Sequence, residues 1–188
     1  MAVGAPLGAV AGVPTGVGRR WTTPAAIALV LAVVVAAAAY GGVWLFGPRA
    51  LQGAGGALVS AQATPGRPVY IGDVASPVRE GTTLDLRSIT PVVVRNTSHA
   101  RIRMVVCHLH GAIGIGTGSA ASVRASCDSL QPFRAGDYEL AHSRGDEILM
   151  QVTPRRAGVL RVARFAVAYR QGMRYGRQYT GVAVTVRS

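Results

Sequence analysis

The sequence predicts an all-β domain, an antiparallel β-sandwich, behind a single N-terminal transmembrane helix. Twenty-eight consecutive residues, Trp21 to Pro48, carry no charged side chain. From Arg67 onward, short runs rich in valine, isoleucine, leucine and tyrosine alternate with turn-forming residues, which is typical of strands in a sandwich. The 188 residues are therefore divided into a disordered cytoplasmic tail (1–20), a transmembrane helix (21–47), a flexible linker (48–66) and a β domain (67–188).

The uncharged run has the length and the flanking residues of a membrane-spanning helix. Its core from Pro24 to Phe46 would reach roughly 34 Å as a helix, enough to cross a bilayer. Trp21 and Trp44 lie near its two ends, where aromatic residues anchor a spanning helix. A cleaved signal peptide is the alternative, because 37–39 are small alanines. The apolar stretch continues beyond them and exceeds a usual signal core, so we favour a retained anchor.

The flanking charges and the cysteines both predict an N-terminus in the cytoplasm. Arg19 and Arg20 precede the span, and only Arg49 follows closely. Cys107 and Cys127 are the two cysteines, and an even pair in an exported domain is most simply a disulfide. Two free thiols, or half of a metal site, are the alternatives. We therefore expect a single-pass protein of the cytoplasmic membrane with its β domain on the extracytoplasmic side.

The β domain follows a linker rich in glycine and alanine, and its strands are short. One irregularity is expected in the strand over 158–169. There Leu160 and Val162 share one face, but from Phe165 onward the apolar residues fall on the opposite parity. An extra residue near Ala163–Arg164 would restore a single core face, so we predict a β-bulge there. No helix is expected among the strands, whose predicted ranges are 68–74, 82–88, 91–95, 100–110, 119–126, 138–142, 147–153, 158–169 and 177–187.

Two short segments carry a family resemblance. PRRAGVL (154–160) and VAYRQG (167–172) resemble the last hairpin of bacterial immunoglobulin-like domains, particularly membrane-anchored ones from high-GC bacteria. In those domains a PxxxG corner leads into a VxYxxG strand end. The resemblance covers roughly 65–188 and implies an immunoglobulin-like antiparallel β-sandwich. Leu160 stands where many such domains have a tyrosine, and the domain has no tryptophan, so the resemblance is to looser relatives of the antibody type.

The charge balance suggests an anionic partner. All twenty basic residues are arginine, only eight residues are acidic, and the 41 residues after Glu147 contain eight arginines and no acid. Anionic lipid, cell-wall polymer, an acidic protein or nucleic acid would suit such a surface, although an extracytoplasmic location argues against nucleic acid. A solvated basic surface without a partner is the alternative.

Two histidines form the best candidate for a metal site. On a strand, His108 and His110 would point to one face about 7 Å apart, and imidazole suits copper or zinc. No third ligand has a telling spacing, and two half-exposed histidines at a strand end are the structural alternative. Other residues that could complete the site are His99, His142, Met104, Met150 and Met173.

The sequence carries no pattern typical of catalysis. It lacks a GxSxG elbow, and the absence of lysine excludes a Ser/Lys mechanism. The glycine-rich stretch 111–118 lacks the βαβ unit of a phosphate-binding loop and reads as a hairpin connection. We therefore predict that the protein is not an enzyme and needs no cofactor.

The segment 169–179 is the best candidate for a binding surface. Three tyrosines, three arginines and a methionine in eleven residues match the composition of interface hot spots. An ordinary hairpin, with its tyrosines packed on the sandwich end, is the alternative. We predict a non-catalytic interaction or accessory module of the cell envelope, with metal binding and docking on anionic lipid or wall polymer as alternative functions. The predicted partner-binding residues are Tyr169, Arg170, Met173, Arg174, Tyr175, Arg177 and Tyr179.

Overall fold

The computed structural model of the chain describes residues 23–46, 49–51, 57–75, 83–111, 114–136, 138–141 and 145–188. Helix α1 (Thr23–Phe46) occupies most of the predicted span, and Pro24–Leu45 is long and apolar enough to cross a membrane. The predicted cytoplasmic tail lies outside the described residues. The helix residues from Tyr40 onward belong to the same compact unit as the β domain, which extends to Ser188.

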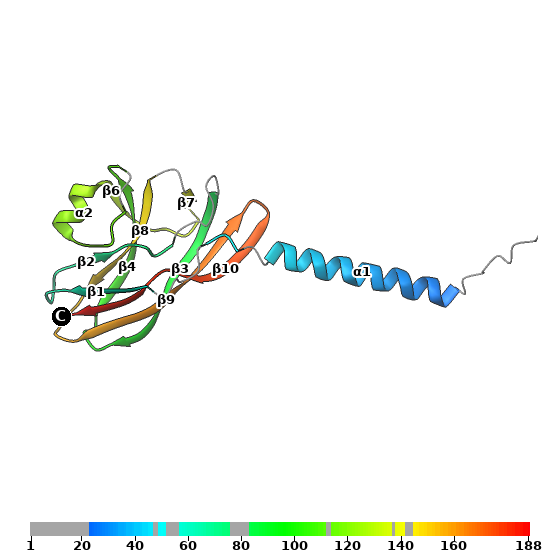
Figure 1. Cartoon of the computed structure of the whole chain (residues 1–188), viewed down its shortest axis with the longest axis horizontal. Coiled ribbons are helices and arrows are strands. Elements are labelled where there is room, and N and C mark those ends of the chain that lie inside the picture. The colour runs from blue at the N-terminus through cyan, green and yellow to red at the C-terminus, as the bar shows by residue number, and fades with distance from the viewer. Residues whose placement is uncertain are drawn as a thin grey trace, which may run out of the picture. The chain divides into compact units, whose positions relative to one another are not determined.

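The described part of the β domain consists mainly of strands in two sheets (Figure 1). The six-stranded sheet has the order β1-β11-β9-β3-β7, with β10 also paired to β9. Its strands are β1 (Leu58–Gln62), β3 (Thr83–Asn96), β7 (Tyr138–Ala141), β9 (Val159–Gln171), β10 (Arg174–Thr180) and β11 (Ala183–Arg187). The five-stranded sheet has the order β5-β2-β8-β4-β6. Its strands are β2 (Val69–Ile71), β4 (Arg101–Leu109), β5 (Thr117–Ser119), β6 (Cys127–Pro132) and β8 (Asp146–Thr153).

Both sheets contribute to one main core. Strand alternation places Ile148, Met150 and Val152 of β8 in this core together with the buried residues of β3, β9 and β11. A second, smaller cluster lies on the other face of the five-stranded sheet, where Leu149 packs with Tyr70. The short helix α2 (Ala120–Ser126) contributes its one buried residue, Val123, to this second cluster.

The predicted β-bulge in β9 is confirmed. Pro91 of β3 pairs with Phe165 and Val93 pairs with Val162, so two residues of β9 lie opposite one residue of β3. The residues on either side of the bulge, including Leu160, Val162 and Phe165, are all buried in the same core. At this point β9 also changes its second partner, because β11 pairs with Val159–Val162 and β10 pairs with Phe165–Gln171.

Part of the predicted flexible linker over 48–66 is instead ordered domain, which corrects the sequence interpretation. Leu58–Gln62 forms β1 and pairs in parallel with β11, the one parallel pair among the described strands. Ala50 and Leu51 are buried in the main core. The glycine and alanine content indicated a linker. The apolar residues within the stretch nevertheless pair with the edge of β11 or pack in the main core.

Four other differences concern the strand assignments. The stretch 119–126, expected as a strand, is largely helix α2, because the Ser119 side chain caps it by accepting a hydrogen bond from the Ser122 amide and its alanines have little β preference. The described residues of the predicted ranges 82–88 and 91–95 belong to one strand, β3, which begins at Thr83. The range 177–187 is divided after Thr180 into parts of β10 and β11. The polar strand β6 was not expected, because it lacks an apolar alternation.

Candidate functional site

The Arg/Tyr segment 169–179 forms the end of the β9–β10 hairpin. Gln171 pairs with Arg174, so only Gly172 and Met173 make the turn. Gly172 has a positive φ of 58°, and the first position of a two-residue type II′ turn is one that glycine prefers. Because the rest of the segment is strand, its side chains alternate between two faces of the sheet.

Four of the predicted partner-binding residues do not point into the core. Tyr175, Arg177 and Tyr179 alternate with the buried Gly176 and Thr180 along β10, and Arg170 lies directly opposite Tyr175 on β9. Tyr175 and Tyr179 are 50% and 51% exposed. Together with Arg164 of the β9 bulge, which contacts Tyr179, they form a surface of arginine and tyrosine that we call the hairpin face: Arg164, Arg170, Tyr175, Arg177 and Tyr179.

The two tyrosines of the hairpin face are each held by an arginine. The Arg164 guanidinium lies 4.1 Å from the centroid of the Tyr179 ring, within the range of a cation–π contact. Arg170 donates from Nε to an Asp85 carboxylate oxygen at 3.0 Å. This hydrogen bond, followed by one with the Tyr175 side chain, raises the pKa of Arg170 above its ordinary value. The arginines therefore restrain side chains that are half exposed to solvent.

Tyr169, predicted as a partner contact, belongs instead to the inner face. It is 1% exposed, its ring covers Gly176 of β10, and its hydroxyl donates to the Gln178 side chain. The Ala50 amide donates to the same hydroxyl at 3.1 Å. Burial raises the pKa of Tyr169 above its ordinary value, against the smaller effects of the Ala50 amide and the charge of Arg174. The structural alternative from the sequence, a tyrosine packed within the domain, is therefore right for Tyr169.

Met173 and Arg174 lie at the tip of the hairpin and away from the hairpin face. Met173 is 77% exposed. Arg174 donates from Nε to the Trp44 carbonyl oxygen at 2.7 Å, and its guanidinium lies 4.9 Å from the centroid of the Trp44 ring. Trp44 lies in the last turn of α1, where backbone carbonyls lack a partner within the helix. The tip is therefore joined to the last turn of α1.

The two histidines of the metal hypothesis each pair with a different carboxylate. His108 Nδ1 lies 2.6 Å from Asp146 Oδ1 of β8, and His110 Nδ1 lies 2.6 Å from Asp128 Oδ1 of β6. In the described ranges, no three histidine, cysteine or acidic residues gather closely enough to hold a metal ion. His142 lies outside those ranges, and His99 contacts Arg156. In the described structure, each of the two imidazoles is thus engaged by its own carboxylate.

Cys107 and Cys127 form the predicted disulfide. It joins β4 to the start of β6, two neighbouring strands of the five-stranded sheet, and lies in the smaller core cluster. The bond closes a sequence separation of 20 residues, which corresponds to about 3 kcal/mol in the chain-entropy model. It stabilises the sheet that lies opposite the hairpin.

Glu147 is a half-buried acid that binds backbone rather than an arginine. Its carboxylate accepts hydrogen bonds from the Ile115 amide at 2.5 Å and from the Asp73 amide at 3.2 Å. Burial raises the pKa of Glu147 above its ordinary 4.5, and these two hydrogen bonds oppose the shift to a smaller extent. The carboxylate ties β8 to the loops that follow β2 and precede β5, which is a structural role.

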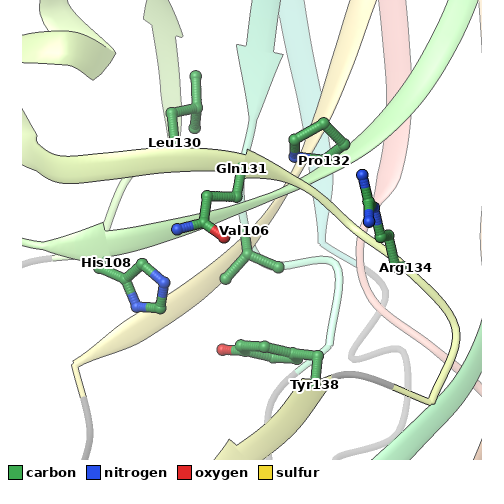
Figure 2. A pocket seen from close by; sticks show the side chains of 7 residues that line it. All are labelled: Val106, His108, Leu130, Gln131, Pro132, Arg134 and Tyr138. Carbon is green, nitrogen blue, oxygen red and sulfur yellow. The ribbon is translucent and has the colours of Figure 1, made fainter.

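A pocket of about 390 Å³ lies where β4 and β6 face β7 (Figure 2). In this view the His108 ring, the Gln131 amide and the Tyr138 hydroxyl lie to the left, and Arg134 lies to the right. Val106, Leu130 and Pro132 complete the lining. Polar groups on an apolar wall are the arrangement that holds a small polar molecule.

Sequence reasoning found the hairpin but missed three of the residues that organise it. Arg164 was noted only for the bulge, Trp44 only as a membrane anchor, and Ala50 only as linker. The predicted bulge could have indicated a role for Arg164, because a bulge redirects a neighbouring side chain and Tyr179 offers a ring for it to contact. The contacts of Trp44 and Ala50 join residues more than 100 positions apart, which no local pattern reports. No protein-family model and no curated protein matches this chain.

Proposed function

We propose that the chain is a single-pass membrane protein whose β domain is a non-catalytic interaction module for another protein of the cell envelope. The length and apolar composition of α1 support the anchor. The disulfide supports an extracytoplasmic location, because such bonds persist in oxidising compartments. The two sheets around a shared core support an immunoglobulin-like sandwich. We propose a loose relative of the antibody type, because the disulfide lies within one sheet rather than between the two.

One observation carries the proposed interaction: two half-exposed tyrosines, Tyr175 and Tyr179, are each restrained by an arginine on the hairpin face. Tyrosine and arginine contribute much of the energy of protein interfaces. Side chains that are already held in one position lose less conformational entropy when a partner binds. The hairpin face therefore combines the composition of a hot spot with side chains that are partly preorganised.

The partner expected at this face is a protein with aromatic and acidic groups. Arg177 is exposed and offers a planar guanidinium, which pairs well with a carboxylate. The tyrosine rings offer apolar area to an aromatic or aliphatic side chain. Since the hairpin is joined to the last turn of α1, a partner anchored in the same membrane would be within reach.

Site-specific photo-crosslinking in intact cells tests this proposal. A photoreactive residue at Tyr175 should give one discrete, salt-resistant protein adduct, whereas the same residue at Arg124 should not. Arg124 is an exposed residue of α2, which packs on the other sheet. Equal adducts from both positions, or none from Tyr175 in a protein that is still folded, would contradict the assignment of the hairpin face.

A further inference from the structure

The tip of the β9–β10 hairpin combines basic and apolar groups beside the end of α1. Arg174 contacts both the ring and the carbonyl oxygen of Trp44, and Met173 is next to it at the turn. Arg49 is exposed and precedes Ala50, whose amide donates to Gln178 of β10 at 2.7 Å. We call these four residues the tip patch: Trp44, Arg49, Met173 and Arg174.

The position of Trp44 gives the depth of the tip patch in a membrane. If Pro24–Leu45 crosses the bilayer, Trp44 lies where the apolar helix ends, which is the interfacial level that tryptophan prefers. Arg174 contacts Trp44 directly, so its guanidinium lies at the level of the lipid headgroups. Met173 adjoins Arg174 at the turn and is exposed, so it lies close to the same boundary, where an apolar group gains from contact with acyl chains.

The charges of the tip patch specify which headgroups fit. The hydrogen bond of Arg174 to the Trp44 carbonyl oxygen uses Nε, and the edge of the guanidinium that carries the two terminal nitrogens can donate to phosphate in a bidentate manner. No acidic residue occurs after Glu147, so the hairpin adds no negative charge of its own. Asp85 of β3 lies beside Arg170 near the turn end of the hairpin, and its carboxylate is engaged by Arg170.

We propose that the tip patch binds the anionic phospholipid headgroups of the bilayer that α1 crosses. Arg49 and Arg174 contact the phosphates, Met173 inserts at the boundary, and the stacking of Arg174 on Trp44 keeps the cation at headgroup depth. This inference rests on the anchor of the proposed function but not on its protein partner. The lipid contact would fix one end of the hairpin at the membrane while the hairpin face remains available.

The test measures the depth of the tip in the full chain, reconstituted into vesicles under non-reducing conditions. Met173→Cys carries an environment-sensitive fluorophore, and the vesicles contain a lipid with a quencher on its headgroup. Ala157→Cys is the matched control, because residue 157 precedes β9 and lies at the opposite end of that strand from Met173. Thirteen strand residues separate the two ends by roughly 40 Å.

The expected result is quenching at position 173 but not at 157, and stronger quenching in phosphatidylglycerol-containing vesicles than in pure phosphatidylcholine. Arg49→Gln with Arg174→Gln should remove this preference. Arg161→Gln with Arg187→Gln, which removes the same charge from exposed positions of β9 and β11, should leave it.

Three results would overturn the proposal. Equal quenching at 157 and 173 would show that the tip has no special depth, and equal quenching in both vesicle types would exclude recognition of anionic headgroups. A fluorophore that responds to soluble anionic wall polymer but not to vesicles would assign the patch to the polymer. Flotation of the vesicles distinguishes a failure of the tip-patch proposal from a failure of the proposed membrane anchor, because a protein without an anchor would not float with the lipid.

Discussion

Tyr169 and Tyr175 belong to the same hairpin and have opposite environments. Tyr169 is buried against Gly176 and bonds with Gln178 and Ala50, whereas Tyr175 is half exposed beside Arg170. The cross-strand register and the alternation of side chains produce this difference: Tyr169 lies opposite Gly176, and Tyr175, the residue before Gly176 on β10, faces the other side of the sheet. The segment whose composition suggests one binding surface therefore contributes to two faces: an inner face that holds the fold and an outer face whose tyrosines are half exposed.

The largest effect expected from this comparison is on stability. Tyr169→Ala removes a fully buried aromatic ring, which costs about 3–5 kcal/mol in comparable phenylalanine substitutions. Tyr175→Ala should change the free energy of unfolding by no more than about 0.5 kcal/mol, as is usual for surface positions. Chemical denaturation of the full chain in detergent, followed by near-UV circular dichroism, measures both. Similar losses for the two variants would contradict the division into inner and outer faces.

Gly176 tests the inner face from the opposite strand. A Cβ atom at this position would lie 2.4 Å from Tyr169 Cζ, so Gly176→Ala must displace the ring. We expect a loss of about 1–3 kcal/mol, the usual cost of overpacking. Gly116→Ala is the control, because a Cβ atom there would meet no atom within 4 Å. If Gly176→Ala were as stable as the control, the ring of Tyr169 would not be fixed against β10.

The same comparison explains which parts of the molecule could be predicted from the sequence. The long apolar helix, the disulfide and the bulge in β9 were all predicted, because a run length, a residue pair or a change of parity encodes each of them locally. β1 was missed because its partner, β11, lies more than 100 residues away in the sequence.

The site was predicted in composition but not in arrangement. Arginine and tyrosine density identified the hairpin, but the predicted strands ended at 169 and resumed at 177, so the side chains between them were not assigned to faces. Once Gly172 and Met173 are known to form the turn, alternation places Tyr169 on one side and Tyr175 on the other. The contact of Arg174 with Trp44 could not be predicted, because it depends on where the chain returns in space.

The comparison of buried with exposed side chains also applies to a charged residue, Glu147. Burial raises its pKa above 4.5, so the folded protein takes up a proton at higher pH than the unfolded chain. The contribution of Glu147 to stability therefore falls as pH rises from about 4.5 through the folded pKa and is constant above it. Glu147→Gln loses, at every pH, one of the two side-chain oxygens that accept hydrogen bonds from backbone amides, and it should also lose this pH dependence.

The measurement is the difference in unfolding free energy between wild type and Glu147→Gln as a function of pH. We expect wild type to lose stability relative to the variant over this window, by less than the cost of Gly176→Ala. A difference that does not vary with pH, or a wild type that gains stability as pH rises, would contradict burial as the dominant influence on this carboxyl group.

The smallest expected effect concerns the outer face itself. The contact of Arg164 with the Tyr179 ring should contribute about 0.5–1 kcal/mol, as cation–π contacts do at exposed sites. A double-mutant cycle of Arg164→Gln and Tyr179→Ala isolates this coupling, because neither residue belongs to the core. A zero coupling energy would mean that Tyr179 is not restrained before binding. If the coupling is present, Arg164→Gln should reduce the yield of the crosslink at the hairpin face although it lowers the free energy of unfolding only slightly. The reason is that its main consequence is the lost preorganisation of a binding side chain.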